Sequence, residues 1–254
     1  MIRRNTAYIA CLLLLLSGLL MAAEWWEKKP YLQWSAGDVK RMLDNSPWGK
    51  VHAVTIMNPT VTGQSSFSGI GTGDIEREKR NLFHLRFLTA KPIRMAIARQ
   101  MMLADKDQAK AAALDRFVRQ RNEDELIVIM SLSSVPEGAS SVRGYWAALM
   151  KLSTPDLASN TILATGSGKR VYIKRYEPPG QDGLGAKFVF PRFLEDGQPV
   201  AVAEDREIRF ETTITLVEFG RLSGEPGENE YERTDRIWMQ FDLRKMLFEG
   251  TLEI

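Results

Sequence analysis

Alternating apolar and polar positions predict strands, most clearly in the C-terminal half of the sequence. Over 207–216 apolar side chains recur at every second position near both ends, and charged or threonine side chains lie between them. The same alternation runs through 80–89. This period of two is typical of a strand with one buried face. The run 126–132, apolar apart from Ser131, predicts a strand buried on both faces. Shorter patterns predict further strands at 51–57, 161–164, 170–175, 186–193, 236–241 and 248–254.

A second pattern, with apolar residues three and four positions apart, predicts helices in the first 152 residues. The first begins after Ser35, whose side chain can accept the backbone N–H of Asp38, and Asp38 can reach back to form a capping box. The spacing of apolar residues predicts further helices over 92–103, 107–121 and 141–152. Thr154-Pro155-Asp156 predicts a turn.

The distribution of these elements sets the fold class. Helices and strands mix before residue 160, and strands and turns follow almost exclusively. The sequence therefore predicts an α+β fold, with a mixed N-terminal half packed on a mostly antiparallel C-terminal half. One continuous domain over 24–254 is favoured. Two packed sub-lobes, 24–158 and 159–254, are the alternative.

The first 23 residues have the pattern of a signal peptide. Arg3 and Arg4 precede an apolar run from Ile9 to Met21, and small residues offer a cleavage site after Ala23. The run is shorter than the roughly 20 apolar residues needed to cross a bilayer as a helix. The sequence therefore predicts an exported protein, periplasmic or extracellular, without a stable membrane anchor after cleavage.

Export also restricts the available chemistry. The only cysteine, Cys11, lies within the predicted signal peptide, so the mature chain has no disulfide, thiolate nucleophile or cysteine-bound metal. The chain holds 34 basic and 32 acidic residues, and Arg3 and Arg4 account for the difference. A balanced mature chain with no basic run argues against nucleic-acid binding. No cofactor motif is present.

Aromatic residues are concentrated at the start of the mature chain. Trp25, Trp26, Trp34 and Trp48 lie within 24 residues of one another, together with Tyr31. One interpretation is that these rings pack the N-terminus onto the domain, because aromatic side chains bury large areas. The other is an exposed platform on which a sugar or a partner peptide stacks.

Candidate catalytic residues are few. His52 and His84, the only two histidines, both fall in predicted strands. A histidine pair could serve as acid and base or bind a metal, although zinc requires three or four ligands. Carboxylates that cleave glycosidic bonds come together only in the fold, and Asp182 is one exposed possibility. As an alternative, Asp182 is simply a turn residue.

An acidic segment precedes the last predicted long strand. Its carboxylates include Glu228, Glu230 and Glu232, which could bind calcium through their oxygens. The spacing is not that of an EF-hand loop. A solvated hairpin tip is the alternative, and we predict no metal.

Two parts of the chain resemble a group of uncharacterised secreted bacterial proteins. The first is Trp34-Ser35 leading to Ser46-Pro47-Trp48, followed by Ala90-Lys91-Pro92-Ile93-Arg94. The second is Phe241-Asp242-Leu243-Arg244-Lys245-Met246 running to Gly250-Thr251-Leu252-Glu253. The resemblance implies no activity, cofactor or catalytic residue.

These observations favour one class of function over two others. The sequence predicts a non-enzymatic binding protein of the cell envelope, whose partner is an envelope protein or a glycan, because catalytic motifs are missing and aromatic residues crowd the N-terminus. The alternatives are a secreted hydrolase of sugar or peptide material, acting through carboxylates or His84, and a structural envelope component.

Overall fold

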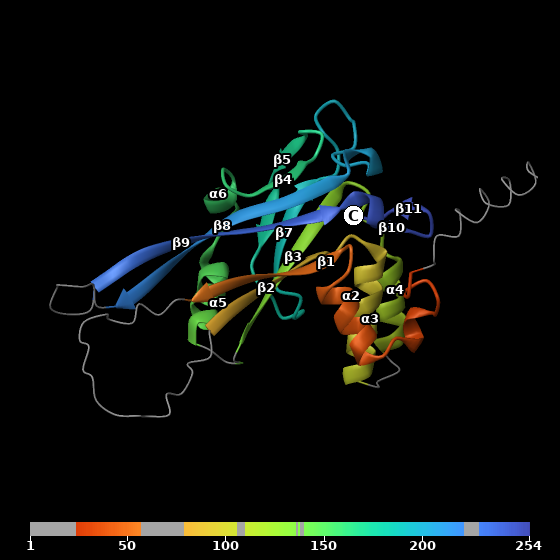
Figure 1. Ribbon diagram of the computed structural model, residues 1–254, viewed down its shortest axis with the longest axis horizontal. Coiled ribbons are helices and arrows are strands. Elements are labelled where there is room, and N and C mark those ends of the chain that lie inside the picture. Colours follow the sequence, from red (N-terminus) through yellow and green to blue (C-terminus); the bar gives the residue numbers. More distant parts are fainter. Residues whose placement is uncertain (1–23, 57–78, 106–109, 136, 138–139, 221–228) are drawn as a thin grey trace, which may run out of the picture.

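Two antiparallel sheets form the centre of the molecule (Figure 1). The structure is a computed structural model that describes residues 24–56, 79–105, 110–135, 137, 140–220 and 229–254. Helices mix with strands in the first half, and strands dominate the second half. The α+β class predicted from the sequence is confirmed.

The larger sheet joins both halves of the chain. Its strand order is β1-β2-β3-β7-β6, and all neighbours are antiparallel. The strands are β1 (Gly49–Ile56), β2 (Lys79–Phe87), β3 (Glu125–Val135), β6 (Arg175–Glu177) and β7 (Ala186–Pro191). Because β3 pairs with β7, strand pairing crosses residue 158, where the two possible sub-lobes would meet.

The smaller sheet has the order β5-β4-β8-β9. Its strands are β4 (Ile162–Thr165), β5 (Arg170–Tyr172), β8 (Glu207–Gly220) and β9 (Asn229–Asp242). β8 and β9 pair along their full lengths, from Glu207↔Asp242 to Gly220↔Asn229. The acidic residues from 229 to 235 therefore lie in a strand and not in a loop, so the hairpin extends beyond the predicted strand ends.

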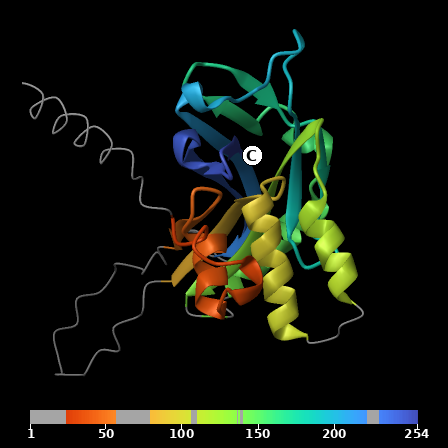
Figure 2. The ribbon, with the colours of Figure 1, turned by 90° about the vertical axis from the view of Figure 1, so that its right-hand side faces the viewer.

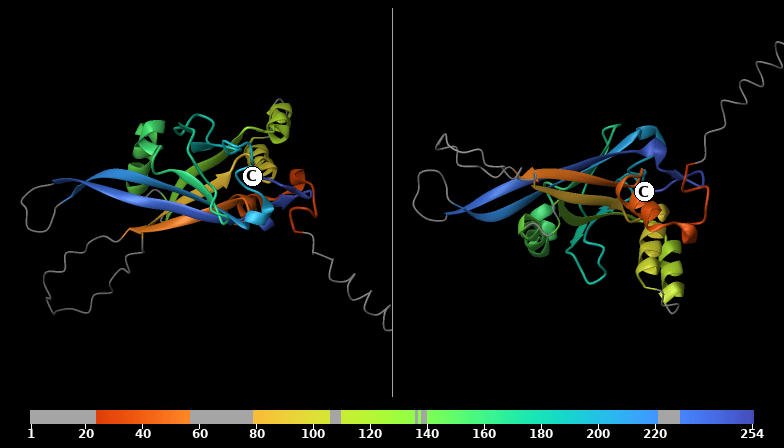
Figure 3. Two further views of the ribbon diagram at one scale, coloured as in Figure 1. Left: turned by 90° about the horizontal axis from the view of Figure 1, so that it is seen from above. Right: turned by 60° about the horizontal axis from the view of Figure 1, so that its bottom comes forward.

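The helices pack on both sheets and on one another. They are the α-helices α2 (Ala36–Asp44), α3 (Lys91–Ala104), α4 (Ala111–Arg119), α5 (Ser140–Lys151) and α6 (Thr154–Leu157), and the 3-10 turns η1 (Tyr31–Gln33), η3 (Ala203–Asp205) and η4 (Leu243–Lys245). α2, α3 and α4 lie together at one end of the molecule (Figure 2). The β8–β9 ribbon extends past α5 on the opposite side (Figure 3). A turn was predicted at α6, but Ser153 and Asp156 form a capping box there that starts a short helix.

The main core lies between the two sheets. Phe87 of β2 meets Phe241 of β9 with ring centroids 4.9 Å apart, and Phe188 of β7 meets Phe210 of β8 at 5.2 Å. All four rings are fully buried. Apolar side chains at alternate positions of both sheets thus face each other, as expected when two sheets pack face to face.

The single strand predicted over 170–175 is wrong in one respect. The backbone changes sheets within it: β5 pairs with β4 in the smaller sheet, and β6 pairs with β7 in the larger sheet. At the change, Ile173 N–H donates to Thr161 O, and Lys174 N–H donates to Val189 O at 2.7 Å. The alternation of apolar and polar residues indicates which side chains are buried, but it does not indicate which neighbouring strand the segment pairs with.

The last predicted strand, 248–254, is also wrong. The chain instead forms a tight hairpin of β10 (Leu247–Phe248) and β11 (Thr251–Leu252). The two residues between them, Glu249 and Gly250, have φ of 51° and 77°. Two successive residues with positive φ are typical of the two-residue turns that join antiparallel strands.

The predicted capping box at the start of α2 is confirmed. Ser35 Oγ accepts the backbone N–H of Asp38 at 3.2 Å, and Asp38 Oδ2 accepts the backbone N–H of Ser35 at 2.8 Å. Lys29 Nζ also donates to Asp38 Oδ2 at 2.6 Å. The hydrogen bonds from Lys29 and Ser35 lower the pKa of Asp38 from 3.8 to about 2.

This pKa predicts an acid-dependent loss of stability. Because the pKa of Asp38 is lower in the folded than in the unfolded state, the stabilisation from its charge is present above pH 4 and is lost as the pH falls towards 2. We expect the melting temperature of the wild type to exceed that of Asp38→Asn at neutral pH, and the difference to disappear near pH 2. Thermal unfolding of both proteins across this range measures it, and a difference independent of pH would contradict this role for Asp38.

Candidate functional site

A chain of three polar side chains crosses from α2 to the larger sheet. Asp44, the last residue of α2, has Oδ1 2.9 Å from Nδ1 of His84 on β2. The other ring nitrogen, Nε2, lies 2.8 Å from Oγ of Ser133 on β3. A carboxylate, an imidazole and a hydroxyl are thus connected in the order found in catalytic triads.

The register of the sheet explains why these residues meet. Phe83 and Phe87 of β2 face the smaller sheet, so His84, between them, faces the opposite side. Ser131 of β3 is directly opposite His84, and Ser133 is two positions further along the same face. The imidazole keeps 12% of its exposure and Ser133 is half-buried, so the chain is partly accessible to solvent.

Two cations fix the charge of Asp44. Arg86 Nη2 donates to Asp44 Oδ1 at 2.8 Å, and Lys40 Nζ donates to Oδ2 at 2.9 Å. Burial alone would raise the pKa of Asp44, but the hydrogen bonds from His84, Arg86 and Lys40 outweigh burial and hold the pKa well below its usual range. Asp44 is therefore a carboxylate that only accepts hydrogen bonds.

His52 and His84 do not form a pair. His52 is opposite Phe83 in the pairing of β1 with β2, whereas His84 is opposite Val51. The two imidazoles therefore lie on opposite faces of the sheet. The ring of His52 packs near Phe83 and Trp238 at 6.3 and 6.4 Å, and burial lowers its pKa. Burial of the ring thus favours the neutral form of His52.

Three of the four N-terminal tryptophans lie in the core. Trp26, Trp34 and Trp48 are 7%, 0% and 0% exposed, whereas Trp25 is half-buried. Neighbouring rings are 5.4–5.6 Å apart, in the pairs Trp25–Trp26, Trp25–Trp34 and Trp26–Trp48. The rings therefore pack the N-terminus onto the domain. Of these four rings, only the partly exposed ring of Trp25 could still stack on a ligand.

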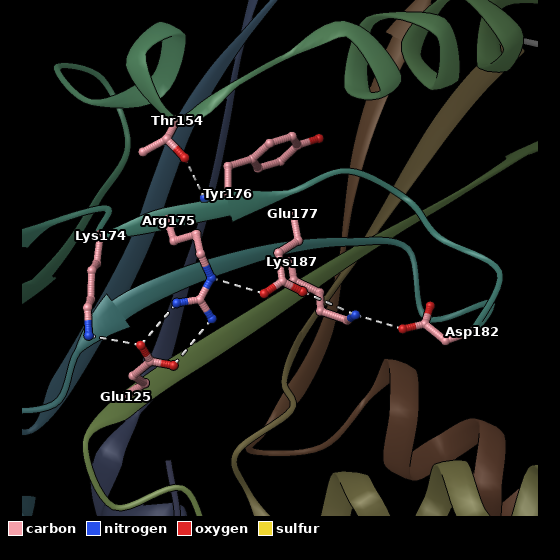
Figure 4. A network of polar contacts seen from close by, with 8 residues as sticks. All are labelled: Glu125, Thr154, Lys174, Arg175, Tyr176, Glu177, Asp182 and Lys187. Atoms are coloured by element: carbon pink, nitrogen blue, oxygen red, sulfur yellow. Dashed lines mark hydrogen bonds and ion pairs between the residues drawn. The ribbon is translucent and has the colours of Figure 1, made fainter.

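Asp182 belongs to a network of ion pairs at the edge of the larger sheet (Figure 4). Its Oδ2 lies 2.7 Å from Lys187 Nζ, and its Oδ1 accepts the N–H of Leu184. Partial burial would raise the pKa of Asp182, but these bonds lower it below its usual value. In the same network Glu125 and Glu177 each contact a lysine or arginine. The pKa values of Asp182 and Glu125 are both lowered, which makes these two carboxylates poorly suited to act as general acids.

The acidic candidates do not form a metal site in the described part of the chain. Glu232 is exposed on β9, opposite Val217. Glu228 and the side chain of Glu230 lie outside the described residues. No group of three histidine, aspartate or glutamate side chains that could hold a metal ion occurs among the residues that the structure describes.

An open groove of about 670 Å³ lies between edge strand β5 and the end of β7. Two aromatic residues line it, Tyr172 of β5 and Phe193, which are 50% and 45% exposed. Arg170, Glu195 and Asp196 also line it. The loop that carries Phe193 is held by backbone hydrogen bonds, including Leu194 N–H to Gln198 O at 2.8 Å. The groove therefore offers two accessible rings beside charges of both signs.

Sequence reasoning missed Asp44, Ser133, Tyr172 and Phe193. Ser131, inside the run 126–132, and Ser133, just after it, lie two positions apart and signal a polar face of β3, but the partner of that face depends on register. Tyr172 lies next to the buried Val171, so alternation alone could have marked it as outward-facing.

Comparison with known proteins does not assign this chain to a family. Neither the scan against protein-family models nor the searches of curated proteins and of solved structures found a match. The resemblance to uncharacterised secreted bacterial proteins therefore stays a prediction. Among the described residues no helix is long and apolar enough to cross a membrane.

Proposed function

We propose that this is an exported binding protein that holds a polysaccharide chain in the groove beside β5. The observation that carries the proposal is the pair of half-exposed rings, Tyr172 and Phe193, on one groove. Large apolar side chains exposed together in a concave site are typical of binding surfaces. Export through residues 1–23 is part of the same proposal.

The groove chemistry favours a neutral, hydroxyl-rich ligand. A sugar ring presents an apolar face of C–H groups, which packs on an aromatic ring, and an edge of hydroxyls, which both donate and accept hydrogen bonds. Arg170 supplies donors, and Glu195 and Asp196 supply acceptors. Charges of both signs match hydroxyls better than they match a uniformly acidic or basic peptide.

The geometry also disfavours an extended peptide as the ligand. A peptide that adds a strand to a sheet needs a long exposed edge with which to pair. β5 is only three residues long. Stacking on the two rings is therefore the main interaction that the groove offers, and it suits a repeating polymer.

We expect alanine at Tyr172 or Phe193 to weaken binding of a tetrasaccharide. Loss of one aromatic contact worth about 0.5–1.5 kcal/mol raises the dissociation constant about two- to tenfold. Isothermal titration calorimetry measures the dissociation constant, with the tetramers of N-acetylglucosamine, β-1,4-linked glucose, xylose and mannose as ligands.

Trp238→Ala is the matched control, because Trp238 is also 45% exposed but lies on β9, away from the groove. We expect this variant to bind like the wild type. Absence of binding to every tetramer would contradict the proposal, as would binding that Tyr172→Ala and Phe193→Ala leave unchanged.

A further inference from the structure

The chain Asp44–His84–Ser133 lies on a different part of the molecule from the groove, and the proposed function does not use it. We propose that Ser133 is a nucleophile and His84 its general base, in an acyl-transfer activity towards small carboxylic esters. The proposal does not depend on polysaccharide binding.

The hydrogen-bond partners decide where the protons lie. Because the ionised Asp44 can only accept, His84 Nδ1 carries the hydrogen in their 2.9 Å contact. In the neutral imidazole the other nitrogen, Nε2, then has a free electron pair. Ser133 Oγ lies 2.8 Å from that nitrogen and must donate its hydrogen to it. The hydroxyl proton is thus already directed at the base that would remove it.

The reaction follows from this arrangement. Ser133 Oγ bonds to the ester carbonyl carbon while its proton moves to His84 Nε2. The tetrahedral intermediate collapses by breaking the bond to the leaving oxygen, and this oxygen takes the proton from His84 as the alcohol departs. Water then attacks the acyl group on Ser133, with His84 again as the base, which releases the acid and restores the hydroxyl.

A positive group is placed beside the reacting serine. Ser133 is opposite Leu82, so on the shared face of β2 it lies between the positions of His84 and Arg80. Arg86 lies on the far side of His84, where its Nη1 donates to Ser131 at 3.2 Å and its Nη2 donates to Asp44. The exposed Arg80 is therefore the cation that the register places nearest to a negative oxygen formed at Ser133.

The supporting groups suggest slow turnover. Acyl-transfer enzymes place several fixed donors around the developing negative oxygen, and loss of one such donor costs about 10²- to 10³-fold in rate. A single arginine supplies fewer donors than such a site. We therefore expect a reagent with an excellent leaving group to modify Ser133 stoichiometrically, even where turnover of ordinary esters is slow.

The test uses diisopropyl fluorophosphate on the full mature chain. Ser133 Oγ bonds to phosphorus, fluoride leaves, and the proton passes to His84. We expect one adduct per molecule in the intact mass, assigned to Ser133 by peptide mapping, and no adduct in urea. His84→Gln should slow labelling about 10²- to 10⁴-fold, the usual contribution of a general base, and Ser133→Ala should abolish it.

Ser131→Ala is the matched control, since Ser131 lies on the same face but is bonded to Arg86 and not to His84. It should label at the wild-type rate. Thermal unfolding verifies that each variant is folded, and peptide mapping of the labelled wild type identifies the serine directly if Ser133→Ala does not fold. An unlabelled wild type, an adduct on another serine, or a rate that His84→Gln leaves unchanged in a folded protein would each overturn the proposal.

Discussion

Replacing Trp48 by alanine is expected to lower the free energy of unfolding by about 3–5 kcal/mol, the usual cost of deleting a large buried ring. Trp48 is fully buried, and its ring packs against Trp26 at 5.4 Å and Phe248 at 6.3 Å. Its Nε1–H donates to the Glu253 carbonyl at 2.7 Å. The substitution therefore removes both the packing and the hydrogen bond that connect the two ends of the described chain.

Urea unfolding followed by far-ultraviolet circular dichroism measures this loss without relying on tryptophan fluorescence. Trp25→Ala is the control, because Trp25 belongs to the same cluster but is only half-buried. We expect a loss of about 1 kcal/mol there, as for a typical substitution. Equal losses in the two variants would show that Trp48 is not the centre of the cluster. The cost at Trp48 also means that tests of binding at the N-terminus should use Trp25 alone.

The second large effect is expected at Gly185, in the connection between β6 and β7. A Cβ atom there would lie 2.2 Å from the Met130 carbonyl oxygen, and φ is +92°. The positive φ costs a non-glycine residue about 1–2 kcal/mol. Forcing the β3 backbone aside adds about 1–3 kcal/mol, as overpacking usually does. We therefore expect Gly185→Ala to lower the free energy of unfolding by about 2–5 kcal/mol.

Gly183→Ala separates the two causes. Gly183 also has a positive φ, +69°, but no atom lies within 4 Å of its would-be Cβ. It should lose only the conformational part, about 1–2 kcal/mol. Chemical denaturation of both variants gives the comparison. If Gly183→Ala is as destabilised as Gly185→Ala, the close approach to Met130 contributes nothing.

Local patterns in the sequence predicted much of the fold. The alternation in β2 and β8, the capping residues of α2 and the apolar spacing in α3 depend on neighbours within a few positions, and each led to an element at nearly the observed place. The failures involve distant partners. The sequence between 170 and 175 has one pattern, yet its two ends join different sheets. Strand partners are set by packing of the whole domain, which no short window contains.

The candidate sites show the same difference between features set by nearby residues, which the sequence predicts, and features set by distant partners, which it does not. His84 was identifiable by residue type, but its partners, Asp44 and Ser133, are 40 and 49 positions away and meet it only through sheet register. Tryptophan content suggested a binding surface at the N-terminus, but three of the four rings there are buried in the core. Composition cannot distinguish a buried ring from an exposed one, because packing in the core and binding at the surface both favour aromatic residues.

The contact between Trp48 and Glu253 also bears on when the protein can fold. The two residues are 205 positions apart, and Phe248 completes the same packing. During synthesis the tryptophan cluster therefore lacks these partners until residues 248–253 have left the ribosome. Contacts between distant positions slow folding. We therefore expect the rings near the N-terminus to reach their final packing late in folding.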